Sequence, residues 1–442
     1  MADFSILSSE IKGKVVLPED SGYSHEIKKV WNAVLLSKRP LAFVKVKCTE
    51  DVVKTVKFCT GNQLDLCVSS GATGDLAIDD DAVVIDFSHM KGVTVDRNNK
   101  VATVLPGSRQ NDVDSELYKH GFAIPLGSYS QLGVAGLTLI GGIGFLASSY
   151  GCTSDNLLKL EVVTVDGEVL SVSEDENEEL FWGMKGFGAN FGIVTSLVFQ
   201  LHEMPQWIVG GCLYYSISNA HEVFRSVRDF HVTQADDRLS IYMILRLRTT
   251  GPEIIVRVLF NGPLKDGGRL VQDLADATHP YKNDVGPVRH DQFQAGGDWM
   301  FSPGKYYYGS AGHFVKELSD EVIDNVIEAM LKKIPGPSKE FADTIIYMNT
   351  YGGKMDQGKP EHSSFPFRNT RFWVGVLGAV STIELFKDLQ TWVDGVQEVN
   401  TAHGLPPFGD YAEQANRRLK ALKKKYDPEN VLCRNLVPIL LE

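Results

Sequence analysis

The sequence lacks the features of a protein that spans a membrane, enters the secretory pathway or binds nucleic acid. No apolar run reaches the ~18 residues needed to cross a bilayer, so we exclude a membrane span. The opening stretch, MADFSILSSEIKGKVV, has no basic leader followed by an apolar segment, so we expect no secretion signal. The net charge of −12 disfavours nucleic acid and anionic membranes, because both bind basic surfaces. We therefore expect a cytoplasmic protein.

The cysteines of the sequence also form no recognisable motif. Six cysteines are scattered along the chain without a C-x-x-C pair or histidines at zinc spacing: Cys48, Cys59, Cys67, Cys152, Cys212 and Cys433. This pattern disfavours a disulfide framework and a structural metal, and it favours reduced thiols.

What the sequence does contain indicates a mixed fold with more than one core. The chain has 442 residues, of which 43% are hydrophobic and 23% charged, as in globular proteins. Residues 41–70 read strand, helix, strand, which predicts a βαβ unit with parallel strands. Further hairpins are expected at DRNNK and at Asp166-Gly167. After Pro205, long amphipathic helices alternate with strands, so we predict an α+β fold with a boundary near residue 204.

Three separate segments are rich in small residues. The first, Ser69–Gly74, follows a predicted strand and exposes backbone N–H groups that can bind a diphosphate, although a tight turn explains it nearly as well. GVAGLTLIGGIGF and FWGMKGFGANFGIVT follow much later in the chain. Because residues 127–156 show neither helix nor strand periodicity, we expect buried irregular backbone there. Together the segments predict one extended ligand of dinucleotide size. A Rossmann site is disfavoured because no strand–G-x-G-x-x-G–helix is present.

The ordered set of motifs resembles a known family. The set comprises the strand–helix–strand entry, the loop before VVIDFSHMKGVTVD, GVAGLTLIGGIGFLASSYGCTSDN, ELFWGMKGFGANFGIVTSLVFQL and RRLKALKKKYDPENVL. It is similar to the FAD-linked oxidases of the vanillyl-alcohol oxidase and p-cresol methylhydroxylase type, and within them to the berberine-bridge-enzyme group. The resemblance covers residues 10–204 and 409–432 well and the middle more loosely.

The resemblance implies a domain arrangement and a chemistry. It implies an FAD-binding domain at 1–204, a substrate domain at 205–403 with an antiparallel sheet covered by helices, and a C-terminal segment at 404–442 that returns to the FAD domain. The implied reaction removes hydride from a C–H next to N or O, with O₂ as electron acceptor. The residues that the resemblance assigns to FAD are Ser69, Ser70, Gly71, Ala72, Thr73, Tyr129, Gly133, Gly136, Gly141, Gly142, Gly144, Ser154, Asn156, Gly192, Val194 and Asn435.

The chain departs from the family at the positions that tether the flavin. Relatives carry R-S-G-G-H or R-G-G-G-H in the loop, and the histidine bonds to the flavin; here Ser69 stands at the arginine, and Ala72 or Thr73 at the histidine. Tyr129 stands where some relatives have a second attachment through cysteine. We therefore expect noncovalent FAD. Cys152 is an alternative thiol further along the chain.

The substrate site is predicted to come from the second domain. The candidates for catalysis are Tyr306, Tyr308, His313, Tyr347 and Asn349. A phenol or imidazole near a bound amine or alcohol could accept a proton as hydride leaves, although these residues could equally pack the sheet. The expected partners are O₂ and a small molecule of secondary metabolism, bound by a monomer or homodimer.

Two alternatives to an oxidase stay open. The loss of both tethers also fits a redox-neutral cyclase or isomerase on the same scaffold, with FAD structural or lost. A non-catalytic binding protein is the third hypothesis.

Overall fold

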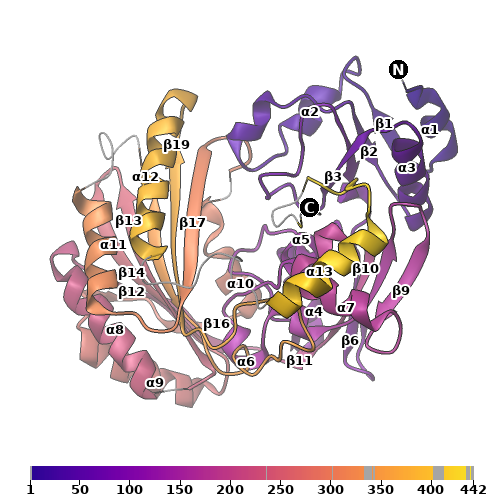
Figure 1. The fold of residues 1–442 in the computed structure, drawn as a ribbon. Helices are drawn as coiled ribbons and strands as arrows, with labels where there is room; N and C mark the ends of the chain where they lie inside the picture. Colours follow the sequence, from indigo (N-terminus) through magenta and orange to yellow (C-terminus); the bar gives the residue numbers. More distant parts are fainter. Residues whose placement is uncertain are drawn as a thin grey trace.

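The structure, a computed structural model, describes residues 2–234, 236–300, 302–332, 341, 344–401, 413–434 and 439. Figure 1 shows two parts that face each other. One part contains the N-terminal half of the chain together with helix α13, and the other is a large sheet with helices on its outer face.

The first sheet contains a short parallel core. Its strands are β1 (Lys14–Val16), β2 (Ala42–Lys45), β4 (Ala82–Asp86) and β3 (Asp65–Ser69), in that order. Helix α3 (Thr49–Gly61) connects β2 to β3, which confirms the strand–helix–strand unit. Strand β4 lies between them and is parallel to both. Helix α1 (Phe4–Glu10) packs on α3. The glycine loop thus begins at the carboxyl end of a partly buried parallel strand at the edge of this sheet.

The second sheet is antiparallel and supports the other two small-residue segments. Its strands are β5 (Val93–Asp96), β6 (Val101–Val104), β10 (Ile193–Gln200), β8 (Leu157–Val163) and β9 (Val169–Ser173), in that order. The predicted hairpins β5–β6 and β8–β9 are confirmed. The helices α4 (Gln110–His120), α5 (Val134–Leu139), α7 (Glu178–Phe187) and α13 (Glu413–Tyr426) contribute buried residues to the same core.

The third sheet is large, and every strand pair recorded in it is antiparallel. Its strands, in order, are β15 (Lys282–Asn283), β12 (Ile208–Tyr215), β14 (Gly251–Phe260), β13 (Leu239–Arg248), β18 (Ile345–Thr350), β19 (Phe372–Val380) and β17 (Tyr307–Val315), and β16 (Gly286–Val288) also pairs with β12. The helices α8 (Ala220–Gln234), α9 (Leu264–Thr278), α11 (Asp320–Lys332) and α12 (Ile383–Thr401) cover one face. The α+β prediction is confirmed.

Alternate residues divide the third sheet into two faces. On β18, Ile346 and Met348 join the core under the helices, whereas Tyr347 packs in a separate cluster with Tyr129 of the N-terminal half. Similarly, Tyr242 of β13 stacks on Phe145 with ring centroids 4.0 Å apart. The uncovered face of the sheet therefore packs against the N-terminal half of the chain.

The remaining elements are short. They are the strands β7 (Phe122–Ala123) and β11 (His202–Glu203), the helices α2 (Tyr23–Ile27), α6 (Ala147–Tyr150) and α10 (His290–Ala295), and the 3₁₀ turns η1 (Ala33–Ser37), η2 (Phe87–His89), η3 (Thr153–Asn156), η4 (Gly188–Asn190), η5 (Ile217–Asn219) and η6 (Asp298–Met300). Within the described residues, no helix combines the length and apolarity required to span a bilayer.

One local prediction was wrong. The residues 127–156 are not uniformly irregular, because they contain α5, α6 and η3. Thr49 is the first residue of α3, and its hydroxyl donates to Glu161 at 2.6 Å. Strands β11 and β12 flank residue 204, and the three-part domain division stays a prediction.

Candidate active site

A cavity of about 320 Å³ lies where the glycine loop meets the two other small-residue segments. The loop 70–74, the segment 132–140 and the segment 189–194 all contribute to its lining. The predicted convergence of three distant segments is therefore present in the structure. We refer to this space as the first cavity.

The glycine loop is held by its carbonyl groups. The Gly71 carbonyl accepts from the Arg109 guanidinium at 3.1 Å, and the Ala72 carbonyl accepts from the Trp31 backbone at 2.9 Å. Among the described residues, the backbone N–H groups of 71–74 donate to no recorded partner. Ala72 has a left-handed φ of 55°, as in backbone nests that bind anions. The loop therefore presents unpartnered donors beside the cavity.

Two glycines allow the loop and the second segment to touch. A Cβ on Gly71 would lie 2.6 Å from the Gly133 Cα, and a Cβ on Gly133 would lie 2.7 Å from the Gly71 nitrogen. Gly136 differs, because a Cβ there would meet no protein atom within 4 Å. Gly71 and Gly133 are thus required by the contact between the two loops, whereas Gly136 leaves room in the cavity.

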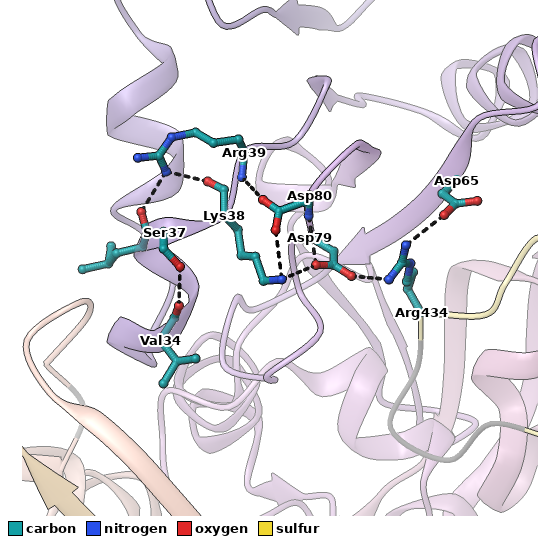
Figure 2. A network of polar contacts seen from close by, with 9 residues as sticks. Val34, Ser37, Lys38, Arg39, Asp65, Asp79, Asp80 and Arg434 are labelled. Atoms are coloured by element: carbon teal, nitrogen blue, oxygen red, sulfur yellow. Dashed lines mark hydrogen bonds and ion pairs between the residues drawn. The ribbon is translucent and has the colours of Figure 1, made fainter. Parts of the chain in front are cut away.

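The C-terminal segment closes one wall of the first cavity. Leu432 and Arg434 line it. Figure 2 shows the Arg434 guanidinium between two carboxylates, with Asp65 at 2.9 Å and Asp79 on its other side. Asp79 is also paired with Lys38 at 2.7 Å. The Arg434 Nε is buried and has no hydrogen-bond partner. Sequence reasoning missed Arg434, because a lone arginine near the chain end carries no motif.

A second cavity of about 330 Å³ continues from the first. The two share Leu132, Leu137 and Ile140. Its aromatic lining residues are Tyr129, Phe314, Tyr347, Tyr351, Phe365, Phe367 and Trp373. It lies between the N-terminal half and the uncovered face of the third sheet, so both parts of the molecule form it.

A chain of hydrogen bonds crosses the second cavity wall. The Asn349 amide nitrogen donates to the Tyr351 hydroxyl at 3.4 Å. The Tyr351 and Tyr242 hydroxyls are 3.0 Å apart, and Tyr242 is 2.9 Å from the Ser128 hydroxyl. Burial raises the pKa of Tyr242 to about 12 and raises the pKa of Tyr351 well above its ordinary value. Both phenols therefore stay protonated at neutral pH.

The predicted catalytic residues do not all lie at the same site in the structure. Tyr347 and Asn349 line the second cavity. Tyr308 stacks on Trp31 with ring centroids 4.0 Å apart, and Tyr306 packs in the same cluster, so neither borders either cavity. A catalytic role for any of these residues stays a prediction.

His313 borders the second cavity, but its imidazole lies on the other side of the strand. It alternates with Phe314 and shares a face with Tyr307 and Val315, which pack towards the helices. Burial lowers the pKa of His313, opposed by the backbone of Gln397 on α12. Direct substrate contact by this ring is therefore disfavoured.

Some of the predicted cofactor residues line a cavity, and others do not. Ser70, Gly71, Ala72, Thr73, Gly133, Gly136, Gly192 and Val194 line the first cavity, and Tyr129 and Gly142 line the second. Five others line neither: Ser69, Gly141, Gly144, Ser154 and Asn156.

The two glycines and Asn156, which lie outside the cavities, contact other parts of the protein. A Cβ on Gly141 would meet the Phe365 ring at 2.3 Å, and one on Gly144 the Leu126 carbonyl at 2.2 Å. The Asn156 amide donates to the backbone carbonyls of Tyr150 and Cys152 at 2.9 Å each. Asn435 lies outside the described residues.

The two cavities fit FAD better than they fit a metal. Unpartnered backbone N–H groups suit a diphosphate, and the aromatic cavity suits a flat ring system. Among the described residues, no group of three His, Cys, Asp or Glu side chains could hold a metal ion. Cys152 is fully buried, borders neither cavity, and burial raises its pKa.

Comparisons with known proteins agree with this geometry. The FAD binding domain family matches residues 40–173. An FAD-linked oxidoreductase of Dictyostelium discoideum is 29% identical over 437 residues, covering 96% of this chain and 94% of that protein. (R)-6-hydroxynicotine oxidase of Paenarthrobacter nicotinovorans is 28% identical over 458 residues, with 95% of each chain covered. In fold, the chain is similar to a berberine-bridge-enzyme-like protein of Physcomitrella patens, with a TM-score of 0.86, 19% identity and full coverage of both chains. The chain therefore contains an FAD binding domain and is an FAD-dependent oxidoreductase that resembles the berberine-bridge-enzyme-like and nicotine oxidase proteins.

Proposed function

We propose that the chain is an oxidase that binds FAD noncovalently and removes hydride from a C–H next to N or O of a small molecule, with O₂ as electron acceptor. One observation carries this proposal: a loop with unpartnered N–H groups borders a cavity that continues into an aromatic cavity. The first cavity would hold the diphosphate and the adenosine side of FAD, and the flavin ring would lie at the entrance of the second.

Particular residues would hold the cofactor. The N–H groups of 71–74 would donate to the diphosphate, and Leu132, Leu137 and Ile140 would pack along the connection between the cavities. Bound FAD would supply a hydride acceptor that O₂ reoxidises.

The absence of a tether supports noncovalent binding. Ala72 and Thr73 line the first cavity and Tyr129 lines the second, and none of them is a histidine or cysteine. The nearby thiol of Cys152 lies within 3.6 Å of the Arg368 guanidinium, away from either cavity lining. Extended burial in two connected cavities would retain the cofactor through many contacts instead.

The described cavity residues favour an amine over an alcohol. Burial raises the pKa of Tyr347 and Tyr351, so neither phenol is ionised at neutral pH, and the His313 imidazole lies on the helix-facing side of its strand. A neutral amine can lose hydride without a base because its nitrogen lone pair stabilises the developing cation, whereas an alcohol must also lose its O–H proton. The name of the nicotine oxidase relative is consistent with an amine. We further propose a substrate of secondary metabolism, a cytoplasmic location and a monomeric or homodimeric state.

Spectroscopy and oxygen chemistry test the proposal together. The purified protein should show flavin absorbance that acid precipitation releases into the supernatant. A panel of aromatic secondary and tertiary amines should bleach that absorbance without oxygen and produce hydrogen peroxide with it. Anaerobic turnover without bleaching would instead support the cyclase or isomerase, with which the missing tethers are also compatible. A colourless protein without turnover would contradict both enzymes and support a binding protein.

A further inference from the structure

Residues 31–33, which we call the connecting segment, join the glycine loop to the third sheet. The Trp31 backbone N–H donates to the Ala72 carbonyl at 2.9 Å. Two residues along the chain, the Ala33 N–H donates to the Tyr306 carbonyl, also at 2.9 Å. A short segment of the N-terminal half is therefore bonded to the loop beside the first cavity and to the chain that leads into β17.

The Asn32 side chain makes the same connection from within the segment. It is buried at 4% exposure. Its amide nitrogen donates to the Asp75 carboxylate and to the Tyr308 carbonyl, both at 2.9 Å. Its amide oxygen accepts from the Tyr308 N–H at 3.0 Å and from the Val34 N–H at 3.2 Å. Because a primary amide has two donor hydrogens and two acceptor lone pairs, every hydrogen-bonding position of Asn32 is used.

The start of β17 is held by this side chain as a neighbouring strand would hold it. Tyr308 uses both its backbone N–H and its carbonyl on Asn32, as residues do in a β-ladder. The Tyr308 ring also stacks on Trp31 with centroids 4.0 Å apart, and the Gly304 N–H donates to the Trp31 carbonyl at 3.1 Å. The first residues of β17 are therefore fixed to the connecting segment.

Strand β17 extends from this connection to the second cavity. It is the last strand in the order of the third sheet, and Gly312, His313 and Phe314, towards its other end, line the second cavity. The loop 70–74 lines the first cavity. The connecting segment therefore lies between a loop of the first cavity and a strand of the second.

We propose that Asn32 is a positioning residue that couples FAD binding in the first cavity to the position of β17 at the second. The N–H groups of 71–74 are fixed when they donate to the diphosphate, and Asp75 and the Ala72 carbonyl are fixed with them. Asn32 transmits this restraint to Tyr308. The coupling rests on the proposed function, because it requires FAD in the first cavity.

Hydrogen exchange of the backbone amides, followed by mass spectrometry, tests the coupling without turnover. The holoprotein as purified is compared with the same protein after its FAD has been removed. FAD should slow exchange in 71–74, and it should also slow exchange about tenfold in 304–308, which borders neither cavity. Slower exchange in 71–74 alone would overturn the coupling and leave the proposed cofactor site intact. A chain that binds no FAD would overturn the coupling and contradict the proposed function as well.

A variant of Asn32 separates coupling from a merely structural role. Asn32→Leu removes all four hydrogen bonds and leaves a branched side chain of similar shape. FAD should still slow exchange in 71–74 of this variant, whereas its effect on 304–308 should disappear. Asn98→Leu, at an exposed turn, is the matched control and should keep both effects. A retained effect on 304–308 in Asn32→Leu would overturn the role of Asn32.

Two variants of the exposed Asp75 test the same link without altering a buried side chain. Asp75→Ala removes the acceptor of the Asn32 amide nitrogen and leaves the bonds between Asn32 and Tyr308 in place, whereas Asp75→Asn keeps an acceptor oxygen. The effect of FAD on 304–308 should fall at least about twofold in Asp75→Ala and persist in Asp75→Asn. Equal effects in the two variants would show that the backbone alone joins the loop to β17 and would overturn the role of Asn32.

Discussion

At the scale of single residues, the site depends on polar atoms that the protein leaves without partners. The N–H groups of 71–74 belong to residues that line the first cavity, and Arg434, whose Nε has no hydrogen-bond partner, belongs to the same lining. The backbone N–H groups of 71–74 therefore remain available as donors to a polar ligand in the first cavity.

A substitution of Arg434 tests whether the wall of the first cavity that it forms contributes to FAD binding. Arg434→Gln removes a charge beside the proposed diphosphate and a partner of Asp65 and Asp79. We expect the dissociation constant for FAD, measured by fluorescence quenching with the apoprotein, to rise about tenfold. Arg417→Gln, an exposed arginine of α13, is the control and should leave it unchanged. Unchanged FAD affinity in Arg434→Gln would remove Arg434 from the site.

Asp114 on α4 gives a pH-dependent prediction. Its carboxylate is buried without hydrogen-bond partners, 4.0 Å from His290 and near Asp291, and burial raises its pKa to about 8. The folded state therefore holds this proton more tightly than the unfolded chain does. Its contribution to stability is complete below the unfolded pKa and is lost as pH rises towards 8.

Asp114→Asn removes the ionisable carboxyl group and with it the loss of folding stability at higher pH. We expect the melting temperature of the variant to exceed that of wild type by a few degrees at pH 8 and to match it near pH 4.5, as measured by circular dichroism. A variant that is less stable than wild type at pH 8 would show that an ionised Asp114 has a stabilising partner.

At the scale of elements, α13 holds the C-terminal segment against the first cavity. Lys423 and Asp427 form a fully buried ion pair at 2.6 Å, and Lys423 also donates to the Asn190 carbonyl at 3.3 Å. Asp427 accepts from the backbone N–H groups of Val431 and Leu432 at 2.8 and 2.9 Å. Asp427, which stands directly before Pro428 at the end of α13, is therefore the anchor of the segment that carries Leu432 and Arg434.

Breaking this pair should affect both stability and FAD retention. Lys423→Met leaves Asp427 buried without its cation, and we expect the free energy of unfolding in urea to fall by about 3 kcal/mol. The FAD content after purification should fall as well, because Leu432 and Arg434 lose their support. Lys424→Met changes the exposed neighbour and should alter neither quantity. Normal stability of Lys423→Met would contradict the anchoring role.

At the scale of the whole molecule, the site exists because two sheets face each other across it. The N-terminal half contributes Tyr129 and Ile140 to the second cavity, and the third sheet contributes Tyr347 and Trp373. Neither half alone encloses this cavity, so its occupant contacts both.

The sequence predicted those parts of this arrangement that local pattern determines. The small-residue loops that follow strands could be recognised because they offer a ligand little besides backbone N–H donors. Their convergence was expected because one extended ligand would contact all of them. Strand alternation places Tyr307 and Tyr308 on opposite faces of β17 and places His313 on the face of Tyr307, so the orientation of His313 could have been predicted from the sequence. Arg434 could not be predicted, because its pairing with Asp65 and Asp79 depends on distant segments meeting in the fold.

FAD titration of a glycine variant tests the central claim most directly. A Cβ added at Gly136, which lines the first cavity, meets no protein atom within 4 Å beyond its own helix and chain neighbours. A Cβ added at Gly268 on α9 is equally free of contacts, but Gly268 borders neither cavity. Wild type and Gly268→Leu should each bind one FAD per chain and release it in acid. Gly136→Leu should fold with an unchanged melting temperature as apoprotein and bind FAD at least about tenfold more weakly. Wild-type affinity for FAD in a folded Gly136→Leu would contradict the placement of the cofactor in this cavity.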